Sequence, residues 1–158
     1  MRHDLQLPAL DPETVTPRQG SGYPQEFRAQ VAGRSKRALG DATGLTQFGV
    51  NQVHLPPGVW SSQRHWHSHE DEFVIVLEGE LTLITDAGEQ VLGPGMVAGF
   101  PAGAQDGHHL INRTDRPAVY LEIGTRIEQD EAFYSDIDME LRVGPDGHAF
   151  RRESGEPY

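Results

Sequence analysis

The sequence predicts an all-β domain, a barrel or sandwich built from short strands. Between residues 41 and 124, short apolar runs recur about every 8–12 residues and are separated by turn-forming residues. The 158-residue chain contains 18 Gly and 11 Pro, which indicates many turns. No part of this region shows the three- and four-residue apolar spacing of a helix. The length is that of one domain with one core.

Three parts of the chain differ in composition. Residues 1–25 are predicted to form an extended N-terminal arm, because four prolines prevent a helix there. This arm is either disordered or crosses over a partner subunit. Residues 26–125 are predicted to form the β-barrel domain. Its strands are expected at residues 46–55, 73–77, 81–85, 89–92, 96–100, 109–112 and 119–123.

Residues 126–158 are predicted to form a C-terminal appendage. An acidic segment at 128–134 favours a short helix. Two strand-like runs, 139–143 and 148–152, flank Gly144-Pro145-Asp146-Gly147, which is a good hairpin turn. We therefore expect one short helix and one hairpin beyond the barrel.

The strand at 73–77, Phe-Val-Ile-Val-Leu, is apolar on both of its faces. A strand with one face in water would alternate apolar and polar residues. Both faces are therefore expected to be covered, one by the barrel interior and the other by a neighbouring sheet or subunit. This pattern favours a homodimer, and the alternative is a cover from within the same chain.

Composition excludes several classes of function. Cysteine is absent, which removes thiolate metal sites, thiol nucleophiles and disulfides. The formal net charge of −11 disfavours nucleic acid and anionic membranes as partners. No secretory signal or membrane span is visible, so we predict a cytoplasmic protein.

Five of the eight histidines lie in two short windows. His65 and His67 share one face of a strand, because residues i and i+2 point the same way. The polar stretch 68–71 breaks the strand, after which Glu72 can face the same interior. In the second window His108 and His109 point to opposite faces, so only one of them can join the first group.

These windows resemble the two motifs of the cupins. The first motif appears as Gly58, six residues, His65-Trp66-His67, four residues, Glu72, six residues and Gly79. The second appears as Gly95, five residues, Pro101-Ala102-Gly103, four residues, His108, three residues and Asn112. The resemblance covers roughly residues 46–124. The spacing to Asn112 favours His108 over His109 as the ligand.

The resemblance implies a double-stranded β-helix (jelly-roll) cupin barrel with a metal ion held by His65, His67, Glu72 and His108. It looks most like small bacterial single-domain cupins of mostly undefined substrate. Three imidazoles and one carboxylate suit a divalent transition metal such as Zn, Fe, Ni or Mn. Four protein ligands leave positions open on a six-coordinate ion but close the shell of a tetrahedral one.

Alternation along the strands selects further candidates for the cavity. Gln63 shares the parity of the two ligand histidines and is predicted to line a substrate pocket, or else to be a polar edge residue. Tyr120 and Glu122 alternate with apolar neighbours and face the cavity if those neighbours pack away from it. They are then candidate catalytic residues, because a tyrosine beside a metal can act as a general acid or base.

Two functions follow from this reading. The first is a metal-dependent enzyme, an isomerase, lyase or dioxygenase, that acts on a small polar metabolite such as a sugar or carboxylic acid. The alternative is a non-catalytic module, stabilised by metal, that binds a small molecule or a partner. One scaffold hosts many chemistries, so the pattern of residues does not select the reaction.

Overall fold

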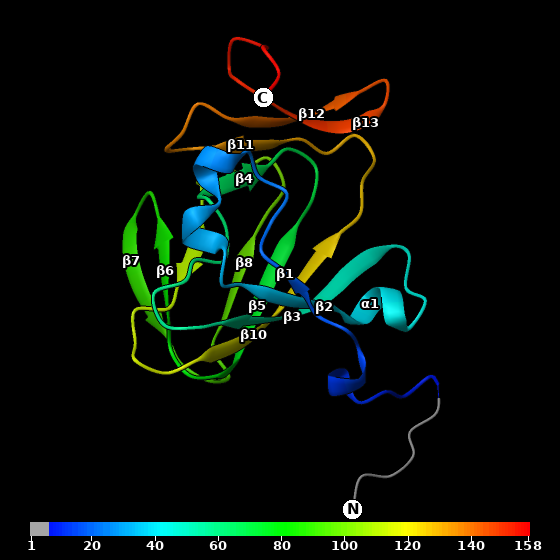
Figure 1. Cartoon of the computed structure of the whole chain (residues 1–158), viewed down its shortest axis with the longest axis vertical. Helices are drawn as coiled ribbons and strands as arrows, with labels where there is room; N and C mark the ends of the chain where they lie inside the picture. Colours follow the sequence, from blue (N-terminus) through cyan, green and yellow to red (C-terminus); the bar gives the residue numbers. More distant parts are fainter. Residues whose placement is uncertain (1–6) are drawn as a thin grey trace, which may run out of the picture.

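The computed structural model describes residues 7–158; residues 1–6 of the predicted arm lie outside the described residues. Strands dominate the described part of the chain (Figure 1). The strands are β1 (Arg18–Gln19), β2 (Ser35–Ala38), β3 (Phe48–Leu55), β4 (His65–His67), β5 (Glu72–Glu78), β6 (Leu81–Thr85), β7 (Gly88–Leu92), β8 (Val97–Phe100), β9 (His109–Ile111), β10 (Ala118–Thr125), β11 (Ala132–Tyr134), β12 (Glu140–Gly144) and β13 (Gly147–Arg151). The short helices are α1 (Leu39–Ala42) and three 3₁₀ turns at Pro12–Thr14, Gln25–Phe27 and Ala29–Val31.

The strands form three antiparallel sheets. The largest has the order β1-β2-β3-β10-β5-β8, and the others are β13-β12-β11-β4 and β7-β6-β9. Single β-bridges join Trp60 to Ile111 and His65 to His108, so the two smaller sheets continue into each other beside the large one. The sheets are not closed into one continuous barrel.

The main core lies between the large sheet and the β7-β6-β9 sheet. Inward-facing side chains of β3, β5 and β10 meet those of β6, β7 and β9 there. The buried members are Val53, Leu55, Val74, Val76, Leu81, Leu83, Leu92, Leu110, Ala118 and Tyr120. Alternation along each strand therefore builds one apolar layer between two sheets.

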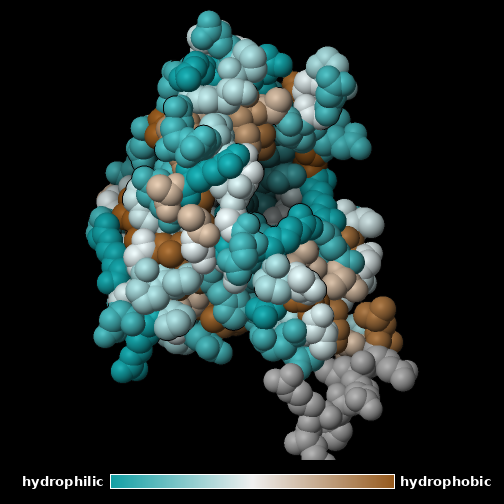
Figure 2. Space-filling model, viewed as in Figure 1, coloured by the Kyte–Doolittle hydropathy of each residue, from teal (hydrophilic) through white to brown (hydrophobic). Residues whose placement is uncertain are grey.

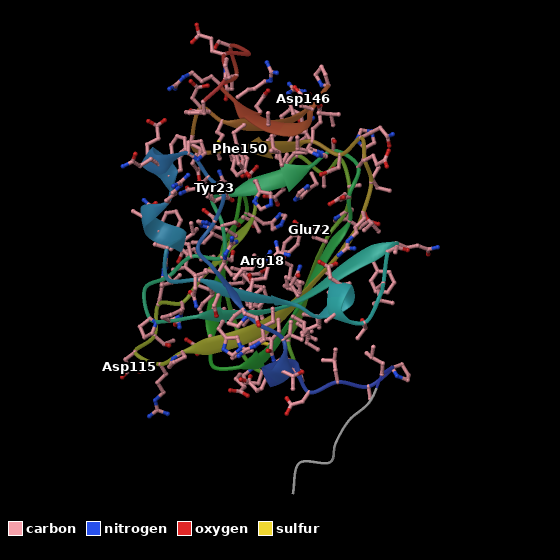
Figure 3. All side chains as sticks on the ribbon, turned by 45° about the vertical axis from the view of Figure 1, so that its right-hand side comes forward. Arg18, Tyr23, Glu72, Asp115, Asp146 and Phe150 are labelled. Carbon is pink, nitrogen blue, oxygen red and sulfur yellow. The ribbon has the colours of Figure 1, made fainter. Side chains whose placement is uncertain are left out.

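A second core ties the N-terminal arm to the C-terminal strands. Tyr23 packs edge-on against Tyr134 and Phe150, with ring centroids 5.6 Å apart in both pairs. Figure 3 shows Tyr23 and Phe150 side by side at the upper part of the molecule. Nearer the N-terminus of the arm, β1 pairs with β2 of the same chain. The described part of the arm thus lies against its own chain.

The structure has a strand at each segment where the sequence predicts one, and the predicted hairpin is formed by β12 and β13. The prediction of a short helix at 128–134 is wrong. Residues 132–134 form β11, which pairs with both β4 and β12. Ala132 and Tyr134 are buried on one face of that strand, so pairing with a distant histidine strand outweighs the local acidic composition.

The outward face of β5 is only partly covered by the described part of the chain. Val74 and Val76 point into the core, whereas Phe73 and Leu77 are 40% and 39% exposed. Val97 on the neighbouring strand β8 is 51% exposed. Residues 7–158 thus leave this face partly open, and the predicted homodimer stays a prediction.

Candidate metal centre

Three side chains converge inside the barrel. The Nε2 atoms of His65 and His67, on β4, lie 3.1 Å apart. The Glu72 Oε2 atom, at the start of β5, lies 3.8 Å from the first and 3.5 Å from the second. Figure 3 shows Glu72 turned inward from its strand. The irregular segment 68–71 between the strands lets all three residues share one interior, as their sequence order predicts.

The hydrogen bonds on the far side of each ring determine which nitrogens carry protons. His65 Nδ1 lies 2.8 Å from the Gln63 carbonyl oxygen, and His67 Nδ1 lies 2.6 Å from Asp130 Oδ2. Both Nδ1 atoms therefore donate, which leaves both Nε2 atoms as lone-pair acceptors in the neutral rings. Two imidazole lone pairs and a carboxylate then face one another with no donor between them. Two imidazole nitrogens and a carboxylate oxygen are ligand atoms that suit a divalent cation.

His108 joins this group, and His109 does not. His108 Nε2 lies 2.8 Å from Glu72 Oε2, and its ring stacks on Phe100 with centroids 3.5 Å apart. His109 instead directs Nδ1 at the Ser62 carbonyl oxygen and packs edge-on against Trp60. The alternation that separates the two histidines thus places His108 beside the other three side chains.

Electrostatics prepares these residues for a cation. Burial lowers the pKa of His65 to about 4, so this imidazole is neutral at pH 7. Burial opposes ionisation of Glu72, but the three neighbouring histidines outweigh it and lower the pKa of that carboxyl. Burial also lowers the pKa of His67, yet the carboxylates of Glu72 and Asp130 raise it above its usual value. A divalent ion would displace the proton that His67 would otherwise hold.

Asp130 supports the centre from outside. It is only 5% exposed, and its Oδ1 accepts hydrogen bonds from the backbone nitrogens of His69 and Glu70, at 2.8 and 3.0 Å. Its Oδ2 holds His67 Nδ1. The same carboxylate therefore orients a ligand ring and the loop behind it. In the sequence Asp130 is one acid in an acidic segment, so nothing distinguishes it from surface charge.

The ligands open onto a cavity of about 240 Å³. This volume is below the ~300–1,000 Å³ of pockets for drug-sized molecules and suits a small metabolite. Figure 2 shows a recess in this face of the molecule, between the C-terminal strands and the strands beneath them. Glu72 and four histidines line the cavity: the three candidate ligands and His109. The other polar side chains in the lining are Tyr23, Arg34, Lys36, Ser61, Ser62, Tyr120 and Glu122.

Both predicted catalytic residues line this cavity. Tyr120 is fully buried, and burial raises the pKa of its hydroxyl well above 10. Glu122 Oε1 accepts hydrogen bonds from Lys36 Nζ at 2.6 Å and from Asn51 Nδ2 at 3.2 Å. Their apolar neighbours Leu121 and Ile123 belong to the opposite face of β10, as the alternation predicts.

Gln63 does not reach the cavity. Its side-chain amide donates to the Phe27 carbonyl oxygen at 3.0 Å and contacts Gln30 at 3.3 Å. Parity along the histidine strand fails here because Gln63 precedes β4, where the backbone is irregular. Its role is to tie the 3₁₀ turns of the arm to the centre, while Arg34 and Lys36, which sequence reasoning passed over, take positions in the wall.

Comparison with known proteins agrees with this architecture. The family model described as Cupin domain matches residues 51–124. A structure described as a sugar phosphate isomerase from a cupin superfamily, from Silicibacter pomeroyi, is 50% identical, with a TM-score of 0.91 and 96% of each chain covered. No curated protein matches the chain.

Two further structures are more distant. A candidate sugar phosphate isomerase from Acidithiobacillus ferrooxidans is 31% identical over 80% of this chain and 81% of its own, with a TM-score of 0.73. A polyketide cyclase from Streptomyces resistomycificus, 21% identical over 74% and 78%, has a TM-score of 0.60 and shows the fold alone. Together these similarities confirm the predicted jelly-roll fold.

Proposed function

Because this chain belongs to the cupin superfamily, we propose that it is a metal-dependent sugar phosphate isomerase. The observation that carries the proposal is the 50% identity, over 96% of both chains, with a protein described as a sugar phosphate isomerase. The inward-facing histidines and Glu72, open to a small polar cavity, supply a site of matching chemistry.

His65, His67, Glu72 and His108 are the proposed ligands, and Zn, Fe, Ni or Mn is the proposed class of ion. When bound, the ion supplies a Lewis acid that polarises a carbonyl or hydroxyl oxygen of the substrate. Asp130 and the Gln63 carbonyl hold the rings of His67 and His65 so that Nε2 faces the site.

Interconversion of an aldose and a ketose moves one proton between neighbouring carbons and a second between their oxygens. Glu122 is the proposed base for the carbon proton, because its carboxylate lines the cavity and Lys36 and Asn51 keep it oriented. The Glu122 carboxyl returns the same proton to the neighbouring carbon. Tyr120, whose hydroxyl stays protonated at neutral pH, is the proposed donor of a hydrogen bond to a substrate oxygen.

The test is an NMR assay of aldose–ketose interconversion with a panel of pentose and hexose phosphates and protein reconstituted with each metal. We expect turnover by the wild type, none by His67→Ala, which loses a ligand, and at least about 100-fold less by Glu122→Gln, which keeps all four. Glu78→Gln, an exposed acid on the same sheet, serves as the control. A metal-replete wild type that binds sugar phosphates and converts none would instead support the non-catalytic binding module.

We further propose that a second copy of the chain covers the outer face of β5 and β8 in the large sheet. Phe73, Leu77 and Val97 present exposed apolar surface there and carry no charge. A chain of net charge −11 repels its own copy, so self-association is most favourable through an uncharged face. A two-fold axis would place the same patch on both sides of the contact.

None of the helices in residues 7–158 has the length and apolar character needed to cross a membrane.

A further inference from the structure

We infer that Arg34 and Lys36 form an anion-binding subsite in the cavity wall and that it takes the phosphate group of the substrate. The inference rests on the proposed function and assigns residues to one part of the substrate. Both side chains line the same cavity as the candidate metal ligands.

Arg34 carries a charge that no carboxylate of the described residues contacts directly. Its terminal nitrogens donate to the backbone carbonyl oxygens of Ser61 and Gly20, which hold the guanidinium rigidly without cancelling its charge. Its Nε is buried and makes no hydrogen bond within the described part of the chain. Among residues 7–158 no acidic side chain forms a salt bridge with it. A half-buried guanidinium with a buried, unsatisfied Nε and no carboxylate partner indicates an anion that the site receives from outside.

The charge of Arg34 acts on the surrounding hydroxyl groups. It lowers the pKa of Tyr23, Tyr120 and Tyr134, although burial outweighs it in all three and their pKa values are raised. These three hydroxyls therefore remain protonated, and Tyr23 and Tyr120 line the same cavity as Arg34. Neutral donors beside a fixed cation are suited to the oxygens of a phosphate.

Lys36 lies on the inward face of β2. It pairs across the sheet with Val53, which is fully buried, whereas its neighbour Arg37 pairs with Gln52 on the outer face. Lys36 Nζ contacts Glu122 at 2.6 Å, and an ammonium has three donors, so two remain for a ligand. Arg34 precedes Lys36 by two residues and lines the same cavity, so one stretch of backbone delivers both cations.

The balance of charge in the cavity also favours an anion. Arg34 and Lys36 offset Glu72 and Glu122, so a divalent ion at the histidines would leave an excess of positive charge. The rest of the chain is strongly acidic, with a net charge of −11. The cavity is therefore a local exception that an anionic substrate would prefer to the surface.

The test measures binding separately from turnover. Calorimetric titrations of the metal-replete and the chelator-treated protein would compare glucose 6-phosphate with glucose, ribose 5-phosphate with ribose, glucuronate, and inorganic phosphate. The variants are Lys36→Met and Arg34→Lys, which keeps the charge but loses the planar fork. Arg37→Gln is the matched control, because Arg37 lies on the same strand and faces outward.

We expect the wild type to bind at least one phosphorylated sugar about tenfold or more tightly than its unphosphorylated partner, as hydrogen bonds to charged groups provide. Lys36→Met should lose most of that preference, and Arg37→Gln should retain it. Thermal unfolding of each variant shows whether it is folded. A loss of preference in Arg34→Lys without loss of folding supports the need for the guanidinium.

Two results would overturn the subsite: equal binding of every phosphorylated and free sugar by the wild type, or a phosphate preference that survives in Lys36→Met. A Lys36-dependent preference for glucuronate with none for phosphate would overturn the assignment to phosphate. If the preference depends on Lys36 but no sugar phosphate is converted, the subsite stands and the proposed isomerase fails. If sugar phosphates are converted while Lys36→Met keeps the preference, the proposed isomerase stands and the subsite fails.

Discussion

Replacing Asp130 with asparagine should weaken metal binding more than it weakens the fold. Asp130 Oδ1 accepts from the backbone nitrogens of His69 and Glu70, so the amide oxygen of asparagine must remain on that side. The new NH₂ group then occupies the position of Oδ2, which lies 2.6 Å from His67 Nδ1. Two donors cannot face each other, so the His67 proton must move to Nε2, the nitrogen that would bind the metal.

The size of the effect follows from these contacts. Loss of a partner that orients a ligand histidine costs about 10–100-fold in metal affinity, or about 1.4–2.8 kcal/mol. The two backbone hydrogen bonds survive and lose only the assistance of a charged acceptor, which costs about 1 kcal/mol. In a chain of this length, that corresponds to a fall in melting temperature of about 2–4 °C for the metal-free protein.

The assay is a competition titration against a chromophoric chelator, with ¹⁵N NMR of His67 to identify the tautomer. Glu131→Gln is the matched control, because it removes the same charge from the neighbouring residue, whose carboxylate instead bonds Arg142. We expect Asp130→Asn alone to show the proton on Nε2. Wild-type metal affinity in Asp130→Asn, or an unchanged tautomer, would refute the reasoning.

Three further predictions concern pH, the backbone and assembly. Because the pKa of His67 is raised and a protonated imidazole cannot ligate, metal affinity should fall as the pH is lowered through that raised pKa. A metal affinity that does not change with pH would contradict an imidazole site. Gly79→Ala should destabilise the protein more than Gly88→Ala in denaturant titrations, by about 1–3 kcal/mol, because both have positive φ but only the Gly79 Cβ would lie 2.7 Å from a backbone oxygen. Phe73→Glu should convert a dimer to a monomer in light scattering; a wild type that is monomeric at high concentration disproves the proposed contact.

The predicted strands and the ligand geometry rest on local patterns. The four motif glycines, Gly58, Gly79, Gly95 and Gly103, all have positive φ, a conformation that favours glycine. The period-two alternation that places Tyr120 and Glu122 toward the cavity holds from Tyr120 onward, because β10 is paired on both sides there and its one register shift against β5 lies before Tyr120. Where the backbone is irregular, as at Gln63, the same parity argument fails.

Residue spacing predicts short strands with His65 and His67 on one face, and the resemblance to the cupin motifs adds the barrel and Glu72, because strand alternation and motif spacing are properties of neighbouring residues. The roles of Asp130, Arg34 and Lys36 depend instead on contacts between distant segments: Asp130 meets His67 across 63 residues, and Lys36 meets Glu122 across 86. An acid or a base in a polar segment carries no local mark of such a partner. Folding is needed to bury it, and burial is what turns an ordinary charge into one that orients a ligand or receives an anion.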